Sequence, residues 1–276
     1  MATDVRAVPI EFVGELNFFG LHGSPTTWDS VGLAAEISGD TSSEAAFQWF
    51  RNQLDYCIKN HRLCNEFDGA KLPPRVLDLG TPGITELDTG IKLVSTVGQK
   101  DRYVCLSYCW GGTIDIRLLR NRYHGYFRRI PWDILPQGYR DAIKLTRKVG
   151  IRYIWIDSLC IVQDDEDDWR QQASIMAQIF QNAYVTIAGT KPENPNNGYF
   201  SVTPPEFIAT RIEHQAQDGT VRHAYVRQTI PHFFSSTASL DSDFTQGDFP
   251  LLSRGWVFQD IPGYSRKGFY LPEYYI

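Results

Sequence analysis

The sequence predicts an α/β protein whose centre is a parallel β-sheet flanked by helices, with additional short strands and loops before and after it. Strongly apolar segments at 103–108, 153–156 and 184–189 indicate buried strands. Amphipathic segments at 137–149 and 168–182 lie between them and indicate helices. This alternation is typical of parallel sheets with right-handed crossovers, because a crossover must carry the chain back to the edge from which each strand starts.

Local patterns predict the elements that precede this core. A helix is expected from Ser42 or Ser43, either of which can cap it, to about Asn60. Short strands are expected at 75–79 and 91–94. The helix has one apolar face at helical spacing, formed by Phe47, Phe50, Leu54, Cys57 and Ile58.

After residue 190 the composition shifts toward Pro, Asn, Ser, Thr and Gln, and only short strands at 207–211 and 221–227 are expected. Three tryptophans, Trp155, Trp169 and Trp256, are expected in the core. We therefore divide the chain into an irregular N-terminal segment (1–43), an α/β domain (44–260, with its core at 103–189) and a C-terminal tail (261–276).

The composition excludes several classes of protein. With 27 Lys and Arg against 32 Asp and Glu, the net charge of −5 gives no general attraction to nucleic acid or anionic membranes. Five cysteines at irregular spacing argue against a disulfide framework. Because no secretory signal and no membrane-length apolar run is present, we expect a cytoplasmic protein without membrane or specific nucleic-acid partners.

The segment 152–168 carries a buried strand that ends in Asp157, Ser158 and Cys160. Open α/β sheets bind ligands beyond the carboxyl ends of their strands, which makes Asp157 a candidate site residue. A carboxylate that caps the following turn is the alternative interpretation. A nucleophilic Cys160 would need a histidine partner, and since none is near in sequence, a buried thiol is favoured.

Three further groups have both a ligand-binding and a structural interpretation. The acidic run 164–168 lacks the spacing of a calcium loop and fits the start of a helix. Cys57, His61 and Cys64 lie on one helical face, but zinc needs four ligands and both cysteines also fit a packed apolar face. The arginines of 117–129 could bind a pyrophosphate or lie on a solvated loop. No metal or cofactor is expected.

Four motifs in order resemble the fungal heterokaryon-incompatibility (HET) domain. They are YVCLSYCWGG (103–112), LPQGYRDAIKLTRKVGIRYIWIDSLCIVQDD (135–165), DWRQQASIMAQIFQNAYVTIAGT (168–190) and LLSRGWVFQD (251–260). The resemblance implies a fungal protein of allorecognition and programmed cell death. It further implies a fold related to the TIR domain, which is a flavodoxin-like α/β fold, and some TIR domains hydrolyse NAD.

The same resemblance implies where a site would lie. Asp260 takes the place of the catalytic glutamate of TIR domains, and Asp157 ends the second strand of the sheet. Asp260 and Gln172 stand where the family more often has glutamate. Residues expected to line the substrate pocket are Ser107, Tyr108, Trp110, Gly111, Ser158, Cys160, Arg254, Trp256 and Gln259.

The resemblance leaves three functional hypotheses. The first is an NAD⁺ glycohydrolase for which NAD⁺, or a related nucleotide, is the substrate, acting as a homo-oligomer. The second is a non-enzymatic signalling module that self-associates and drives cell death through its partners. The third is a family scaffold recruited to other small-molecule chemistry.

Overall fold

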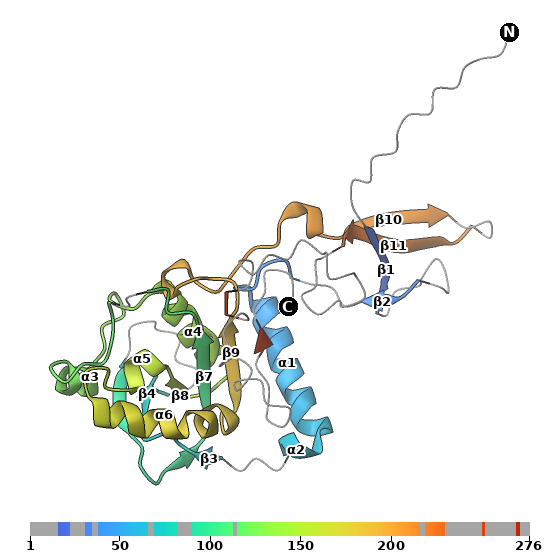
Figure 1. Cartoon of the computed structure of the whole chain (residues 1–276). Helices are drawn as coiled ribbons and strands as arrows, with labels where there is room; N and C mark the ends of the chain where they lie inside the picture. The colour runs from blue at the N-terminus through green and yellow to red at the C-terminus, as the bar shows by residue number, and fades with distance from the viewer. Residues whose placement is uncertain are drawn as a thin grey trace. The chain divides into compact units, whose positions relative to one another are not determined.

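The structure is a computed structural model, and it divides the chain into two compact units (Figure 1). One unit comprises Met1–Gly39 with Thr203–Asp241, and the other comprises Asp40–Val202 with Ser242–Ile276. In the part of the chain that is described, no helix is long and apolar enough to span a membrane. The described residues are 16–22, 31–34, 38–65, 69–81, 90–112, 115–215, 219–229, 250–251 and 269–270.

The larger unit contains a six-stranded sheet in the order β12-β9-β7-β8-β4-β5. Strand β7 pairs in parallel with β8 and β9, and β12 pairs in parallel with β9. The strands are β4 (Arg75–Asp78), β5 (Lys92–Ser95), β7 (Tyr103–Tyr108), β8 (Tyr153–Trp155), β9 (Val185–Gly189) and β12 (Phe269–Tyr270). The α/β class is therefore confirmed.

The sheet is mixed, which corrects the expectation of a parallel sheet with separate short strands beside it. Strands β4 and β5 join the same sheet, and β4 runs antiparallel to both β5 and β8. Antiparallel neighbours need no crossover helix, unlike parallel ones. A two-stranded ribbon of β3 (Ala70–Lys71) and β6 (Lys100–Asp101) lies in the same unit.

Helices α4 and α6 are the crossovers between the parallel strands and pack against the sheet (Figure 1). Asp165 caps α6, because its carboxylate accepts the backbone N–H of Asp168, and Ser43 caps α1 in the same way. The helices are α1 (Glu44–Asn60), α2 (Arg62–Asn65), α3 (Tyr123–Arg128), α4 (Gln137–Lys148), α5 (Asp157–Cys160) and α6 (Glu166–Gln181), with the 3₁₀ turns η1 (Pro195–Asn197) and η2 (Pro205–Phe207).

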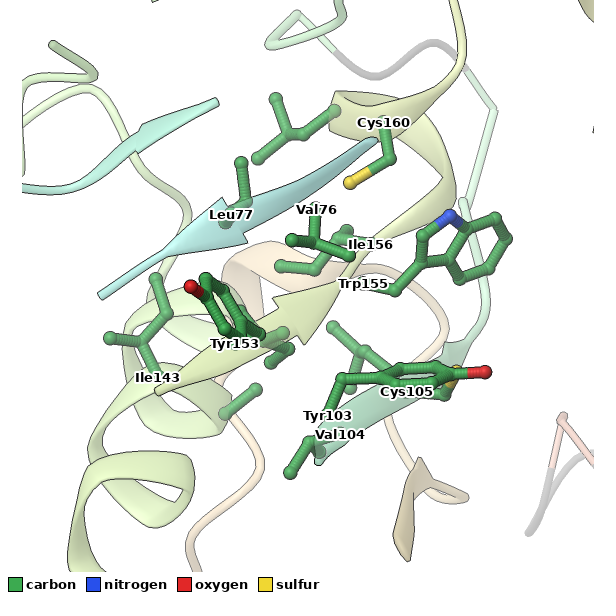
Figure 2. Packing of buried hydrophobic residues seen from close by; sticks show 14 of the residues in the cluster. Val76, Leu77, Tyr103, Val104, Cys105, Ile143, Tyr153, Trp155, Ile156 and Cys160 are labelled. Carbon is green, nitrogen blue, oxygen red and sulfur yellow. The ribbon is translucent and has the colours of Figure 1, made fainter. Parts of the chain in front are cut away.

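The core of this unit forms where the sheet meets its helices (Figure 2). Trp155 of β8 is fully buried and packs edge to face on Phe180 of α6, with ring centroids 5.6 Å apart. The buried hydroxyl of Tyr103 donates to the carbonyl oxygen of Ile179 at 2.6 Å. The polar atom of this aromatic side chain is therefore satisfied inside the apolar layer.

The prediction that Trp169 lies in the core is wrong, because 51% of its surface is exposed. The inward stripe of α6 passes through Asp168, Gln172 and Ile179 instead. Asp168 faces inward to pair with Arg75, and the adjacent Trp169 then points about 100° away around the helix.

The smaller unit contains a four-stranded sheet in the order β10-β11-β1-β2. Strand β1 pairs antiparallel with β11, and β10 and β11 form a hairpin. The segment 1–43 is thus not irregular throughout, since β1 lies in it and pairs with a strand some 200 residues later. The strands are β1 (Leu16–Leu21), β2 (Leu33–Ala34), β10 (Thr210–Gln215) and β11 (Val221–Gln228).

Candidate functional site

The carboxylate of Asp157 is the centre of a hydrogen-bond network at the carboxyl ends of β7 and β8. Its Oδ1 accepts the hydroxyl of Tyr108 at 2.8 Å and the backbone N–H of Ser158 at 2.6 Å. Its Oδ2 accepts the indole Nε1–H of Trp110 at 2.8 Å. Because β7 and β8 are neighbouring parallel strands, residues that follow both strands meet at one edge of the sheet.

A chain of hydroxyl groups extends this network into the protein. The hydroxyls of Tyr108 and Tyr139 are 2.6 Å apart, and the Tyr139 hydroxyl is 2.7 Å from Oγ of Ser158. All three side chains are buried. Sequence reasoning missed Tyr139, although it lies three residues before Ala142 and therefore on the inward face of α4.

Both phenols of this chain keep their protons well into the alkaline range. Burial raises the pKa of Tyr108 and of Tyr139, and the negative charge of Asp157 adds to the effect in each case. Burial also raises the pKa of Tyr103 and of Tyr199. At neutral pH the hydroxyls of Tyr108 and Tyr139 therefore act as hydrogen-bond donors and acceptors rather than as bases.

We expect the free energy of unfolding to fall as the pH rises above about 10. Tyrosines of the unfolded chain lose their protons there, while the buried ones keep theirs in the folded state. Below pH ~9 each tyrosine with a raised pKa contributes fully to the free energy of unfolding. Above pH ~10 each of them lowers that free energy by about 1.4 kcal/mol per pH unit. Urea unfolding at several pH values measures the slope.

Two conservative variants separate this effect from other alkaline titrations. Tyr139→Phe should make the slope shallower, since it removes one buried phenol. Tyr56→Phe is the matched control, because it removes the same hydroxyl from a side chain that is 60% exposed. Equal slopes for the wild type and Tyr139→Phe would contradict the assignment.

Four of the expected pocket residues are buried below the surface, namely Ser107, Tyr108, Ser158 and Cys160. Ser107 lies within β7, and Cys160 is 1% exposed in the main core cluster (Figure 2). Burial raises the pKa of the Cys160 thiol to about 12, so it carries its proton at neutral pH. Ser158 is likewise fully buried and bonds only inward in the network described above.

A hollow of about 320 Å³ opens beside Trp110, at the carboxyl end of the sheet. One wall is formed by residues that follow β7, and a second wall by residues that follow β9. Leu135 and Pro136, at the start of α4, also line it. Its lining residues are Trp110, Gly111, Asp115, Ile116, Ile134, Leu135, Pro136, Asn194, Pro195 and Asn196.

Gly111 allows these two walls to meet. Its φ of +66° is in the left-handed region that favours glycine. A Cβ atom there would lie 2.3 Å from Cβ of Asn194 and 2.6 Å from the carbonyl oxygen of Glu193. Trp110 therefore gives the hollow an aromatic lining, and Gly111 lets the chain after β7 approach Glu193 and Asn194 closely.

An open groove of about 450 Å³ continues from the hollow and shares Asp115, Ile116 and Ile134 with it. Arg122 and Arg129 are among the residues that line the groove. Nη1 of Arg122 donates to the carbonyl oxygen of Asp115 at 3.0 Å, which holds that arginine at the rim.

Several residues of the acidic run form structural contacts, two of them with Arg120. The backbone N–H of Arg120 donates to Asp164 at 2.8 Å, and its guanidinium pairs with Asp165 at 3.1 Å. Asp168 pairs with Arg75. These contacts agree with the interpretation of residues 164–168 as the start of a helix.

Two groups of predicted residues remain. Cys57, His61 and Cys64 come together, and their possible ligand atoms all lie within 4.8 Å of one another. The candidates of the C-terminal motif, Arg254, Trp256, Gln259 and Asp260, lie outside the described residues, so their roles stay predictions.

Comparison with known proteins gives one match. The family model described as "Heterokaryon incompatibility protein (HET)" matches residues 103–260, which is more than half of the chain. The match begins at the first residue of β7 and includes Trp110, Tyr139 and Asp157. No curated protein and no solved structure matches the chain.

Proposed function

The chain belongs to the heterokaryon incompatibility (HET) family, and on that premise we propose that it acts in fungal incompatibility and cell death by hydrolysing NAD⁺. The site would be the hollow and groove at the carboxyl end of the six-stranded sheet. The reaction breaks the bond between nicotinamide and ribose, and the bonding electrons leave with nicotinamide. Water supplies the new oxygen on the ribose carbon and releases a proton.

The position of the hollow in the sheet carries this proposal. Numbered along the chain, the parallel strands β7, β8, β9 and β12 stand in the order 2-1-3-4. This is the beginning of the flavodoxin-like order, in which ligands bind at the switch point between the first and third strands. The hollow lies there, since residues after β7 and residues after β9 both line it. The arrangement supports a TIR-like fold.

The walls have the chemistry that a dinucleotide needs. The Trp110 indole is fixed by its bond to Asp157 and offers an aromatic face to nicotinamide or adenine. Arg122 and Arg129 line the adjoining groove and suit a pyrophosphate, because guanidinium groups bind phosphate oxygens by charge-assisted hydrogen bonds. Both volumes are in the range of small-molecule sites.

We assign the two carboxylates different roles. Asp157 is a positioning residue, because both of its oxygens already accept bonds from Tyr108, Trp110 and Ser158. Asp260 is the proposed catalytic carboxylate, which would stabilise the positive charge that develops on the ribose as nicotinamide leaves.

Incubation of the purified protein with NAD⁺ and NADP⁺, with the products separated by chromatography, tests the proposal. We expect nicotinamide and an ADP-ribose product, and we expect Asp260→Asn to lower turnover by at least about 100-fold with an unchanged circular dichroism spectrum. The assay should cover a range of protein concentrations, because the proposed enzyme acts as a homo-oligomer.

Equal turnover by the wild type and by folded Asp260→Asn would overturn the role of Asp260. If neither nucleotide is consumed at any concentration, while expression of both proteins remains toxic to the cell, the protein is a non-enzymatic signalling module instead.

A further inference from the structure

A cysteine–histidine–cysteine cluster at the end of α1 forms a second candidate site in the larger unit. Sγ of Cys57 and Sγ of Cys64 are 3.4 Å apart, and Nδ1 of His61 is 3.3 Å from Sγ of Cys57. All possible ligand atoms of the three side chains lie within 4.8 Å of one another. We propose that Cys57, His61 and Cys64 together bind one zinc ion.

The spacing of these atoms fits a tetrahedral zinc ion. With Zn–S bonds of about 2.3 Å and a Zn–N bond of about 2.0–2.1 Å, two sulfur ligands lie about 3.8 Å apart and a sulfur and a nitrogen about 3.6 Å apart. The observed 3.4 Å and 3.3 Å are shorter by a few tenths of an ångström. The third pair, His61 and Cys64, lies within 4.8 Å, so binding requires side-chain rotations that bring this pair to about 3.6 Å.

The backbone of the α1–α2 turn brings the ligands together. Helix α1 ends at Asn60, and His61 follows in an extended conformation, with its N–H donating to the carbonyl oxygen of Cys57 at 3.0 Å. The N–H of Cys64 then donates to the carbonyl oxygen of His61 at 2.8 Å. These two bonds fold α2 back toward the end of α1. Cys64, three residues after His61, therefore comes close to Cys57, four residues before it.

The ligand set selects the metal. Two thiolates and an imidazole suit zinc, whereas magnesium and calcium prefer oxygen ligands. The three side chains leave the fourth tetrahedral position to a further ligand such as water. His61 is exposed, so the ion lies at the surface and can exchange with a chelator. The bound ion would tie α2 to the last turn of α1.

A disulfide between Cys57 and Cys64 is the competing use of these sulfur atoms. Their separation of 3.4 Å is well beyond the disulfide bond length of about 2.05 Å. The nitrogen of His61 at 3.3 Å also has no role in a disulfide, whereas it supplies the third ligand to a metal. The geometry therefore favours a metal over a disulfide.

The test measures metal in the full-length protein, purified under reducing conditions from zinc-supplemented cells. We expect about one zinc per chain by plasma mass spectrometry. Replacing zinc with Co²⁺ should give the visible absorption bands of a tetrahedral site and a near-ultraviolet thiolate-to-cobalt band. Cys57→Ser, Cys64→Ser and His61→Asn should each weaken zinc binding by about 100-fold or more in a chelator competition.

His124→Asn is the matched control, since His124 is an exposed histidine on α3, outside the cluster. It should keep the zinc content and the cobalt spectrum of the wild type. His61→Asn changes only an exposed side chain, so it remains informative if the cysteine variants unfold.

Three results would overturn the proposal. The first is less than about a tenth of an equivalent of zinc in the wild type, together with no cobalt bands. The second is wild-type zinc affinity in folded His61→Asn. The third is a Cys57–Cys64 disulfide in freshly purified protein that does not take up metal after reduction.

Discussion

Replacing Asp157 with alanine should lower the free energy of unfolding by about 2–4 kcal/mol and remove NAD⁺ turnover. The carboxylate is the shared acceptor of the Tyr108 hydroxyl, the Trp110 indole N–H and the Ser158 backbone N–H. A buried donor that loses its acceptor costs about 1–3 kcal/mol, and Tyr108 can still bond to Tyr139. Urea unfolding and the NAD⁺ assay measure the two effects.

Asp157→Asn separates shape from hydrogen bonding. The asparagine amide keeps the shape and one acceptor oxygen, but its NH₂ group then faces a donor. We therefore expect a free energy of unfolding between those of the wild type and of Asp157→Ala. A stability change below about 0.5 kcal/mol for Asp157→Ala would show that the network contributes little.

Replacing Asp168 with alanine should lower the free energy of unfolding by about 3–5 kcal/mol, because it leaves a buried arginine without its partner. Oδ2 of Asp168 accepts Nη2 of Arg75 at 2.5 Å and the backbone N–H of Val162 at 2.8 Å. The side chains of Arg75 and Asp168 are only 12% and 14% exposed. Urea unfolding again gives the measurement.

Asp167→Ala is the matched control, because it removes the same charge from the same helix turn at an exposed position. It should cost no more than about 1 kcal/mol, which is the size of a helix-dipole effect. The double variant Arg75→Met with Asp168→Leu should be more stable than Asp168→Ala, since it leaves no buried charge unpaired. Equal losses for Asp167→Ala and Asp168→Ala would refute this account.

The elements that the sequence predicted well are those with a continuous local pattern. Strand β7 was expected at 103–108 and occupies Tyr103–Tyr108, and α4 differs from its prediction by one residue at its end. The β7 segment is apolar over nearly its whole length, and the apolar residues of α4 keep one helical period.

The errors arose where distant residues decide the outcome. The antiparallel pairing of β4 with β8 depends on residues about 75 positions apart, and strand partners are not encoded in local periodicity. Trp169 is exposed because the pairing of Asp168 with Arg75 sets the rotation of α6. The role of Tyr139 in the hydrogen-bond network was not predicted for the same reason, since its partners come from β7 and α5.

The candidate site was predictable in part. The motifs identified the family, and the rule for the ends of parallel strands brought Asp157 and Trp110 to one edge of the sheet. They did not indicate that Asp157 is already bonded through both oxygens, because Tyr108 and Trp110 come from another strand. The residues after β9 that complete the hollow also lacked a local signal.

Equilibrium binding of ADP-ribose, measured by titration calorimetry, tests most directly whether the hollow and groove bind a dinucleotide. Both Arg129 and the neighbouring Arg128 are exposed, but only Arg129 is among the residues that line the groove. We predict that Arg129→Gln weakens binding by about 10-fold or more, while Arg128→Gln stays within about 2-fold of the wild type. Absence of binding by the wild type, or equal affinities for the two variants, would contradict the proposed site.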